Sequence, residues 1–438
     1  MEYPVWFLPG FSKGLIIATV AVLHVFVAHF AVGGGIFLVA MERRAHALNS
    51  APLLDWLERH SHFFMLLTMV FGGLSGVGIW FTISVISPAA TSFLVHDFLF
   101  IWAAEWAFFL LEIVSLVAYY YTYRLCRDGR MPPRTHMRIG LVYAGSGFMS
   151  LFLVNGIVSF MLTPGAALEH GSLWQGFFNP GFWPSVVYRT ALSLLIAGMF
   201  ALFTVARIRN DGARRFAARQ SALWITIPFV LLALSSYWYY LALPPDRQAA
   251  VLRRTADIHP FVTAYGWLLP VIFLAGVYAF IRAERLRRPL TVVILATGLM
   301  LIGSYEWIRE TGRRPWIIPG HMYSNGFTVE EGAFAAENGM AAGSGWSALV
   351  RAADRAAVKG SPAPAISHGA YLFAAQCGPC HGTGGPTLDL LPRIRNLTPD
   401  GLTAQLRGQG LRQSYMPPFF GNERDIADLA AYLRTLKE

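Results

Sequence analysis

The sequence predicts an all-α protein in which a polytopic bundle of eight transmembrane helices precedes a small α-helical C-terminal domain. Three observations support this fold class. Of the 438 residues, 55% are hydrophobic and only 14% are charged, and the mean hydropathy is +0.46. The apolar residues gather in blocks about as long as the ~20 residues that a helix needs to cross a bilayer. A polar stretch, residues 366–438, follows a segment rich in Gly, Ala, Ser and Pro.

The composition also excludes several classes of protein. So few charges exclude an ordinary soluble globular protein. The formal charge of +10 comes from 35 basic and 25 acidic residues. Most arginines lie in short segments between apolar blocks, which indicates membrane orientation, so we expect lipid contact and no nucleic-acid partner. Three cysteines are too few for a disulfide framework.

The apolar blocks predict eight spans, in order along the chain. They cover about residues 13–40, 62–87, 98–122, 139–162, 186–206, 222–243, 261–281 and 290–308. The segment before the first block, Met1–Trp6, has neither a basic n-region nor a small-residue cleavage site. We therefore expect the first block to be an uncleaved transmembrane helix.

The arginines predict how the bundle is oriented. Segments after the first, third, fifth and seventh spans carry 17 arginines, and those after the second, fourth and sixth carry 4, counting Arg189 at the edge of a span. Because basic loops stay on the cytoplasmic side, we expect both termini outside the cytoplasm. The expected location is the bacterial cytoplasmic membrane, with the C-terminal domain on the periplasmic side.

The composition predicts three regions: a transmembrane domain over residues 1–316, an extracytoplasmic linker over 317–365 and a small domain over 366–438. The linker is expected to hold one short helix near Trp346–Lys359. In the small domain, helices are expected over Gly369–Gln376 and Glu423–Leu436. The second has an apolar stripe formed by Ile426, Leu429, Ala430 and Leu433.

Cys377-Gly-Pro-Cys380-His381 is a haem-attachment pattern. Two thiols can add to the haem vinyl groups while the adjoining imidazole binds the iron from below. Met416, in a Pro-stiffened stretch 35 residues after His381, offers a thioether as sixth ligand. The alternatives are a chance pattern, a zinc pair and a redox dithiol. The domain resembles a class I cytochrome c, which implies one covalent haem c with Cys377, Cys380, His381 and Met416 in the family's roles.

Ionisable side chains inside the predicted spans are functional candidates, because a charge in hydrocarbon costs a few kcal/mol. Glu105 and Glu112 are seven residues apart, so they share one helix face about 10 Å apart along the axis. They offer proton-exchanging or iron-ligating carboxyls. His24 and His29 lie about 140° apart around their helix and cannot both face one haem. The alternative for each histidine is a packing role. His60 and His62 are expected at the membrane interface.

The membrane part resembles subunit I of cytochrome bd-type oxygen reductases. The matching stretches are His24–Phe30 with Met41-Glu42, Gly72–Gly76, Glu105–Glu112, Val154–Gly156 with Met161–Pro164, and Glu310–Trp316. The resemblance implies that His24 is the axial ligand of a high-spin haem b and that Glu105 and Glu112 lie beside the haem b and haem d pair. It also implies that Glu306 stands near the position of the family's third carboxylate and helps to bind the haem. It also implies a second, bd-like membrane subunit.

Three departures from that family affect the expected cofactors. Tyr188 stands where the family has a low-spin haem histidine, and Leu268 stands near the position of its methionine partner. The outer loop that binds quinol in the family is reduced to about Pro244–His259, and a cytochrome c domain replaces the ninth helix. The resemblance with these departures predicts that the low-spin haem b is missing or differently ligated and that electrons arrive by another route.

Together these features predict an oxidoreductase: a respiratory subunit that passes electrons from haem c to intramembrane haem b, with haem d as a further candidate, and reduces O2 to water. The expected iron ligands are His381, Met416, His24 and Glu112. An extracytoplasmic cytochrome or another donor would supply electrons. Two alternatives stay open: an electron-transfer module between a membrane pool and extracytoplasmic cytochromes, and a haem c-bearing anchor subunit of a larger redox complex.

Overall fold

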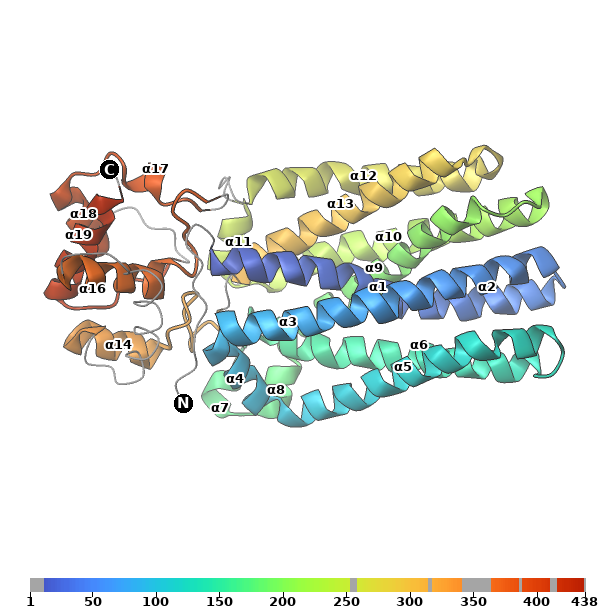
Figure 1. Cartoon of the computed structure of the whole chain (residues 1–438), viewed down its shortest axis with the longest axis horizontal. Coiled ribbons are helices and arrows are strands. Elements are labelled where there is room, and N and C mark those ends of the chain that lie inside the picture. Colours follow the sequence, from blue (N-terminus) through green and yellow to red (C-terminus); the bar gives the residue numbers. More distant parts are fainter. Residues whose placement is uncertain are drawn as a thin grey trace.

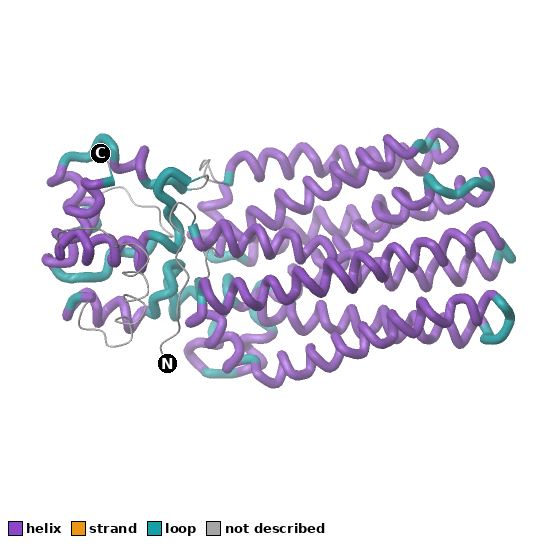
Figure 2. Tube along the Cα trace, in the orientation of Figure 1, coloured by secondary structure: helices purple, strands orange, loops and turns teal. Residues whose placement is uncertain are grey.

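The structure is a computed structural model that describes residues 12–252, 258–313, 317–340, 364–385, 388–409 and 416–436. These ranges are almost entirely helical and contain no strand; two isolated bridges join Ile318 to Met322 and Met322 to Thr328. Figure 2 shows a long helical bundle next to a smaller helical domain. The predicted all-α fold class is confirmed.

Eight helices are long and apolar enough to cross a membrane, as predicted. They are α1 (Lys13–Ala47), α2 (Ala51–Leu66) continued by the π-helical η1 (Leu67–Gly72) and α3 (Gly73–Ile86), α5 (Leu99–Arg127), α6 (Pro133–Phe160), α9 (Phe182–Val205), α10 (Asp211–Ala242), α12 (His259–Ile281) and α13 (Arg288–Arg313). Several helices extend beyond the predicted spans because backbone hydrogen bonding continues past the apolar block until a cap ends it. Asn210, for example, caps α10 by accepting from the Ala213 amide.

The two ends of the bundle differ. At the end beside the C-terminal domain lie the short helices α4 (Pro88–Asp97), α7 (Ala167–His170), α8 (Leu173–Phe177) and α11 (Pro245–Leu252) (Figure 1). Tight connections, including the 3₁₀ turn η2 (Ala283–Arg285), close the opposite end. The arginine-rich segments therefore lie at the end of the bundle opposite the C-terminal domain.

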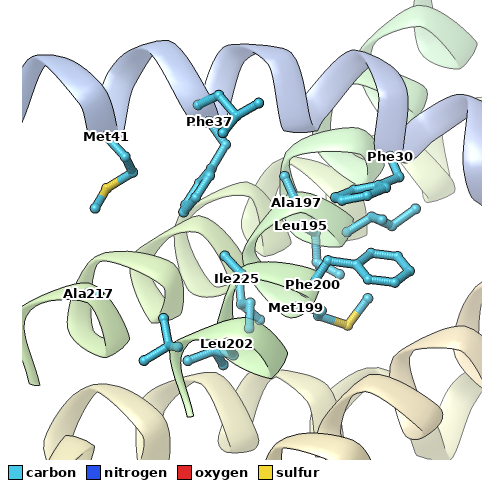
Figure 3. Close-up of a cluster of buried hydrophobic side chains, with 14 of the residues drawn as sticks. Phe30, Phe37, Met41, Leu195, Ala197, Met199, Phe200, Leu202, Ala217 and Ile225 are labelled. Atoms are coloured by element: carbon cyan, nitrogen blue, oxygen red, sulfur yellow. The ribbon is translucent and has the colours of Figure 1, made fainter. Parts of the chain in front are cut away.

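The core of the bundle lies between α1, α9 and α10 (Figure 3). Phe30 and Phe37 from α1 pack against α9 residues such as Phe200, and the Phe30 and Phe200 rings lie 4.2 Å apart between centroids. A Cβ at Gly33 would overlap the Ser193 carbonyl on α9, so glycine there allows close contact between the helices. This half of the bundle is therefore densely packed.

Buried polar residues, some of them from the sequence motifs quoted above, join the end of α6 that lies beside the C-terminal domain to the following loop. Asn179 donates to the Gly156 carbonyl (3.1 Å) and accepts from the Thr163 hydroxyl (2.9 Å). Asn155 accepts from Ser185 on α9 (2.6 Å). These buried polar groups are satisfied by one another, which gives the motifs a structural role.

The C-terminal domain is built from α14 (Val329–Asn338), α16 (Pro364–Leu372), the π-helical η4 (Phe373–Cys377), α17 (Leu391–Ile394), α18 (Pro399–Leu406) and α19 (Glu423–Thr435). The predicted stripe of α19, Ile426, Leu429, Ala430 and Leu433, is buried. Helix α16 crosses α19 at Gly369, where a Cβ would overlap the Asp428 carbonyl oxygen.

Part of the segment predicted as linker packs into this domain. Phe327, Ala335 and Met340 are buried in the same apolar cluster as Tyr371 and Leu429. The Met340 amide donates to the Asp425 carboxylate (2.9 Å), which ties the end of α14 to α19. The short helix predicted near Trp346–Lys359 lies outside the described residues.

Candidate functional site

The Cys377–His381 turn follows directly from η4. The amides of Cys380 and His381 both donate to the Cys377 carbonyl, at 3.1 and 2.8 Å, which closes the turn and brings both thiols and the imidazole to one place. His381 Nδ1 donates to the Leu388 carbonyl (2.9 Å). That bond fixes the tautomer and makes Nε2 the ring nitrogen suited to an iron.

The structure helps to separate haem attachment from the other interpretations of this motif. Neither Cys377 nor Cys380 forms a disulfide in the part of the chain that the structure describes. Desolvation, and secondly the nearby Cys380, raise the pKa of the Cys377 thiol to about 12, whereas a redox dithiol needs an acidic thiol. Among the described residues, neither cysteine belongs to a group of three metal-binding side chains. Thiols that add to haem vinyl groups fit these observations.

Gln376 is a residue of this site that sequence reasoning missed. Its amide donates to the Phe420 carbonyl (2.5 Å) and accepts from the Phe420 amide (2.8 Å). These two hydrogen bonds hold the segment that carries Met416 against η4, which leads into the Cys377–His381 motif. Met416 itself is 41% exposed, and its role as sixth ligand stays a prediction. The available sequence signal was the position of Gln376, directly before Cys377.

His24 points from α1 toward α3. Its Nδ1 lies 3.1 Å from the Ser75 hydroxyl, which donates its single hydrogen to the Phe71 carbonyl (2.7 Å). His24 Nδ1 must therefore be the donor to Ser75, which leaves Nε2 unprotonated and able to bind a metal. A Cβ at Gly76 would lie 3.3 Å from the His24 ring, so the glycine makes room for it.

Glu105 and Glu112 both face α6, as their spacing predicts. Ser150 donates to Glu105 (2.6 Å), and Glu112 is hydrogen-bonded to the Tyr143 hydroxyl. The carboxyls are close enough to interact electrostatically. Tyr143 also donates to the Ala31 carbonyl on α1 (2.9 Å). Its single hydrogen can be donated to Ala31 or to Glu112 but not to both at once.

These residues border the less packed half of the bundle. Leu74 of α3 and Trp106 of α5 are 71% and 61% exposed, which leaves apolar helix faces without protein cover. A histidine with an available nitrogen, two carboxyls and space left by glycines fit a haem between α1, α3, α5 and α6. In this arrangement His24 would hold the iron, and Glu105 and Glu112 would lie beside it.

The structure places Glu306 and His29 in the densely packed half of the bundle. Glu306 is 1% exposed and accepts from Arg309 (2.7 Å), which also binds Glu310 (2.8 Å); Glu310 pairs with Arg313. His29 donates to the Val25 carbonyl (2.8 Å) and interacts electrostatically with Glu306. Glu306 is thus grouped with arginines, away from the α6 contacts of Glu105 and Glu112, and its role toward haem stays a prediction.

The position expected for a low-spin haem ligand is filled by aromatic side chains. Tyr188 is 1% exposed and stacks on Tyr305, with 4.0 Å between ring centroids and 25° between planes. The Tyr265 ring lies 5.8 Å from Tyr305, and Leu268 packs against the same core. These stacked rings leave no gap for a porphyrin at Tyr188, so the residues do not fit a low-spin haem there.

The side chain of His60 is buried inside the bundle, and its expected position at the membrane interface stays a prediction. His60 is 1% exposed, donates through Nδ1 to Thr204 (2.9 Å) and lies among Phe37, Trp56 and Phe63. The α2 helix begins at Ala51, well before the predicted span, so His60 lies in its second half and faces the core. His62 is exposed and stacks on Tyr120.

Comparisons with known proteins agree with both parts of this structure. Residues 364–433 match the family model described as cytochrome c oxidase, cbb3-type, subunit III, so the C-terminal part is a cytochrome c domain. The chain is similar to the structure of bd oxidase from Geobacillus thermodenitrificans, with a TM-score of 0.60 and 16% identity, over 80% of this chain and 100% of that chain. No curated protein matches the chain in sequence. The predicted combination of a bd-type membrane fold with a cytochrome c domain is confirmed.

Proposed function

We propose that this membrane haem protein passes electrons from its cytochrome c domain to haem held between α1, α3, α5 and α6, where O2 is reduced to water. Each O2 would take up four electrons and four protons to give two waters. The haems, c-type in the domain and b-type with d as a candidate in the bundle, would supply the redox chemistry. The chain's residues would hold them, exclude water and deliver protons.

The contact between the haem-attachment turn and α1 is the observation that carries this proposal. The Pro379 carbonyl, inside the turn, accepts from the Gly14 amide at the first turn of α1 (3.2 Å). Lys13 beside it is 8% exposed and interacts with Cys380. His24 lies ten residues after Gly14, about 15 Å along the same helix. The turn is thus placed over the helix that carries the proposed intramembrane ligand.

The polar groups facing α6 support a proton-delivery role. Glu105 and Glu112 lie about 10 Å apart along α5. Ser150 and Tyr143 on α6 are each hydrogen-bonded to one of these carboxyls. Protons taken up during O2 reduction would move between these groups, a task for which buried carboxyls beside a redox centre are suited.

Electrons would arrive on the outer face from an extracytoplasmic cytochrome or another donor. The closed packing at Tyr188 and the short connection of α10 to α12 support a route that bypasses a low-spin haem. The arginine-rich end of the bundle would face the cytoplasm. A second membrane subunit and lipid would cover the apolar faces of α3 and α5.

Oxygen uptake by the protein purified from its own membrane, with its subunits and haems, tests the proposal. With a reductant that reduces haem c, we expect steady O2 consumption and re-oxidation of haem c when O2 is added. If haem c is reduced and intramembrane haem follows but no O2 is consumed, the electron-transfer module is favoured. If haem c is the sole haem, the anchor subunit is favoured.

A further inference from the structure

We propose that the chain binds one Zn²⁺ ion at the end of the bundle opposite the cytochrome c domain, through Glu42 and His46 of α1 and Cys126 of α5. A carboxylate oxygen, an imidazole nitrogen and the thiol sulfur of these residues all lie within 4.8 Å of one another. Sulfur, nitrogen and oxygen donors together favour Zn²⁺ over Mg²⁺ or Ca²⁺, which prefer oxygen alone. The site is remote from the haem-binding residues.

Glu42 is held in position by two further residues. It is 1% exposed; Tyr119 donates to Oε2 (2.8 Å), and His136 Nδ1 lies 2.7 Å from Oε1. The other ring nitrogen of His136 donates to the Tyr119 carbonyl (2.9 Å). A carboxylate oriented by a histidine and a tyrosine behind it is the arrangement by which proteins fix a metal ligand.

His46 and Cys126 complete the ligand set. His46 lies one helical turn after Glu42, and its Nε2 is 3.5 Å from Glu42 Oε1. Cys126 is a buried free thiol near the end of α5. Ligand atoms around a tetrahedral Zn²⁺ lie about 3.5 Å apart, so a small rotation of the partly exposed His46 ring would bring the three donors to that spacing.

A cavity of about 450 Å³ gives access to the site and room for a water as fourth ligand. It is lined by His46, Cys126, Arg127 and neighbouring apolar residues. The Arg127 guanidinium pairs with Asp55 and Glu58, each at 2.6 Å, so its charge is balanced and does not oppose a cation. A bound ion would link the ends of α1 and α5.

The experiment uses the holoprotein purified with a tag that contains no histidine, stripped with a chelator and dialysed against Zn²⁺. Zinc per haem c is measured by elemental analysis, and Cys126 labelling by a maleimide is followed with and without Zn²⁺. In the holoprotein the other two cysteines are in thioether bonds and do not react. We expect about one Zn²⁺ per chain. We also expect bound Zn²⁺ to slow the reaction of Cys126 with the maleimide about tenfold or more.

Four variants test the ligands. Cys126→Ser and His46→Gln should each weaken Zn²⁺ binding about tenfold or more, and His136→Gln, behind Glu42, about 10-fold to 100-fold. His62→Gln changes an exposed histidine at the same end of the bundle and should bind Zn²⁺ as the wild type does.

Haem c content and elution volume show whether each variant is folded. His46 is partly exposed, so its variant gives an answer even if Cys126→Ser does not fold. Unchanged affinity in His46→Gln, or labelling that Zn²⁺ does not slow, would overturn the proposal.

Discussion

At the scale of single residues, Glu112 has the contacts expected of a proton carrier. Its carboxyl shares the Tyr143 hydroxyl with a backbone carbonyl of α1, and Glu105 is its electrostatic neighbour. Of these contacts, Glu105 is the other titratable carboxyl with which Glu112 could exchange protons. The same carboxyl could also hold iron, and two variants distinguish these roles.

We expect Glu112→Gln to lower O2 turnover about a hundredfold or more while leaving haem content unchanged, because an amide keeps the shape but cannot carry the proton. Oxygen-electrode rates and haem spectra of the purified variant check this. Glu169→Gln, which changes an exposed glutamate in α7 at the end of the bundle beside the C-terminal domain, is the control. Loss of a haem together with turnover would instead make Glu112 an iron ligand. Normal haem content and normal turnover would remove it from the mechanism.

Gly147 should be needed to position Glu112. A Cβ at Gly147 would lie 3.2 Å from the Glu112 carboxyl, whereas a Cβ at Gly145, two residues earlier on α6, would meet nothing within 4 Å. We expect Gly147→Ala to lower O2 turnover several-fold and Gly145→Ala to leave it unchanged. Gly145→Ala is a matched control because the two exchanges change helix propensity equally. Equal turnover in the two variants would show that Glu112 needs no such space.

At the scale of elements, α1 joins the two parts of the molecule. Its first turn contacts the haem-attachment turn, its middle carries His24 on the α3 side, and His29 faces the opposite half of the bundle. The helix therefore separates a half that can hold haem from a half that is filled by side chains. Movement of the cytochrome c domain away from α1 should interrupt electron transfer.

Gly14→Pro tests that contact. Proline is tolerated in the first turn of a helix but removes the amide that donates to Pro379. We expect haem c to form normally, and stopped-flow spectroscopy to show slower oxidation of haem c by the intramembrane haem. Gly14→Ala, which keeps the amide, should behave as the wild type. An unchanged rate in Gly14→Pro would mean that the domain docks without this bond.

The crossing of α16 and α19 requires a glycine. We expect Gly369→Val to destabilise the cytochrome c domain by about 1–3 kcal/mol, because the side chain would overlap the backbone of α19. Thermal melting followed at the haem c absorbance would show a lower midpoint. Ala427→Val, which enlarges a side chain on the exposed face of α19, should melt near the wild-type temperature.

At the scale of the whole molecule, features that depend on local sequence could be predicted and features that depend on packing could not. The eight spans follow from apolar length, and the α19 stripe follows from helical periodicity. The Cys377–His381 motif carries its chemistry in five consecutive residues. The tyrosine stack around Tyr305, the burial of His60 and the contact of Pro379 with Gly14 each join segments far apart in the chain. No periodicity encodes such contacts.

The tyrosine stack also distinguishes the two halves of the bundle. One half of the bundle keeps a histidine and carboxyls beside uncovered helix faces, and the other half is closed around Tyr188 and Tyr305. We therefore expect haem in one half of the bundle only, and we expect His24 to hold it.

A pyridine haemochrome measurement on the purified protein and on His24→Ala tests this expectation most directly. We expect one covalent haem c and at least one non-covalent haem per chain in the wild type, with the non-covalent haem lost in His24→Ala and haem c unchanged. A wild-type protein that contains haem c alone would contradict the account, and so would a His24→Ala variant that keeps its full non-covalent haem.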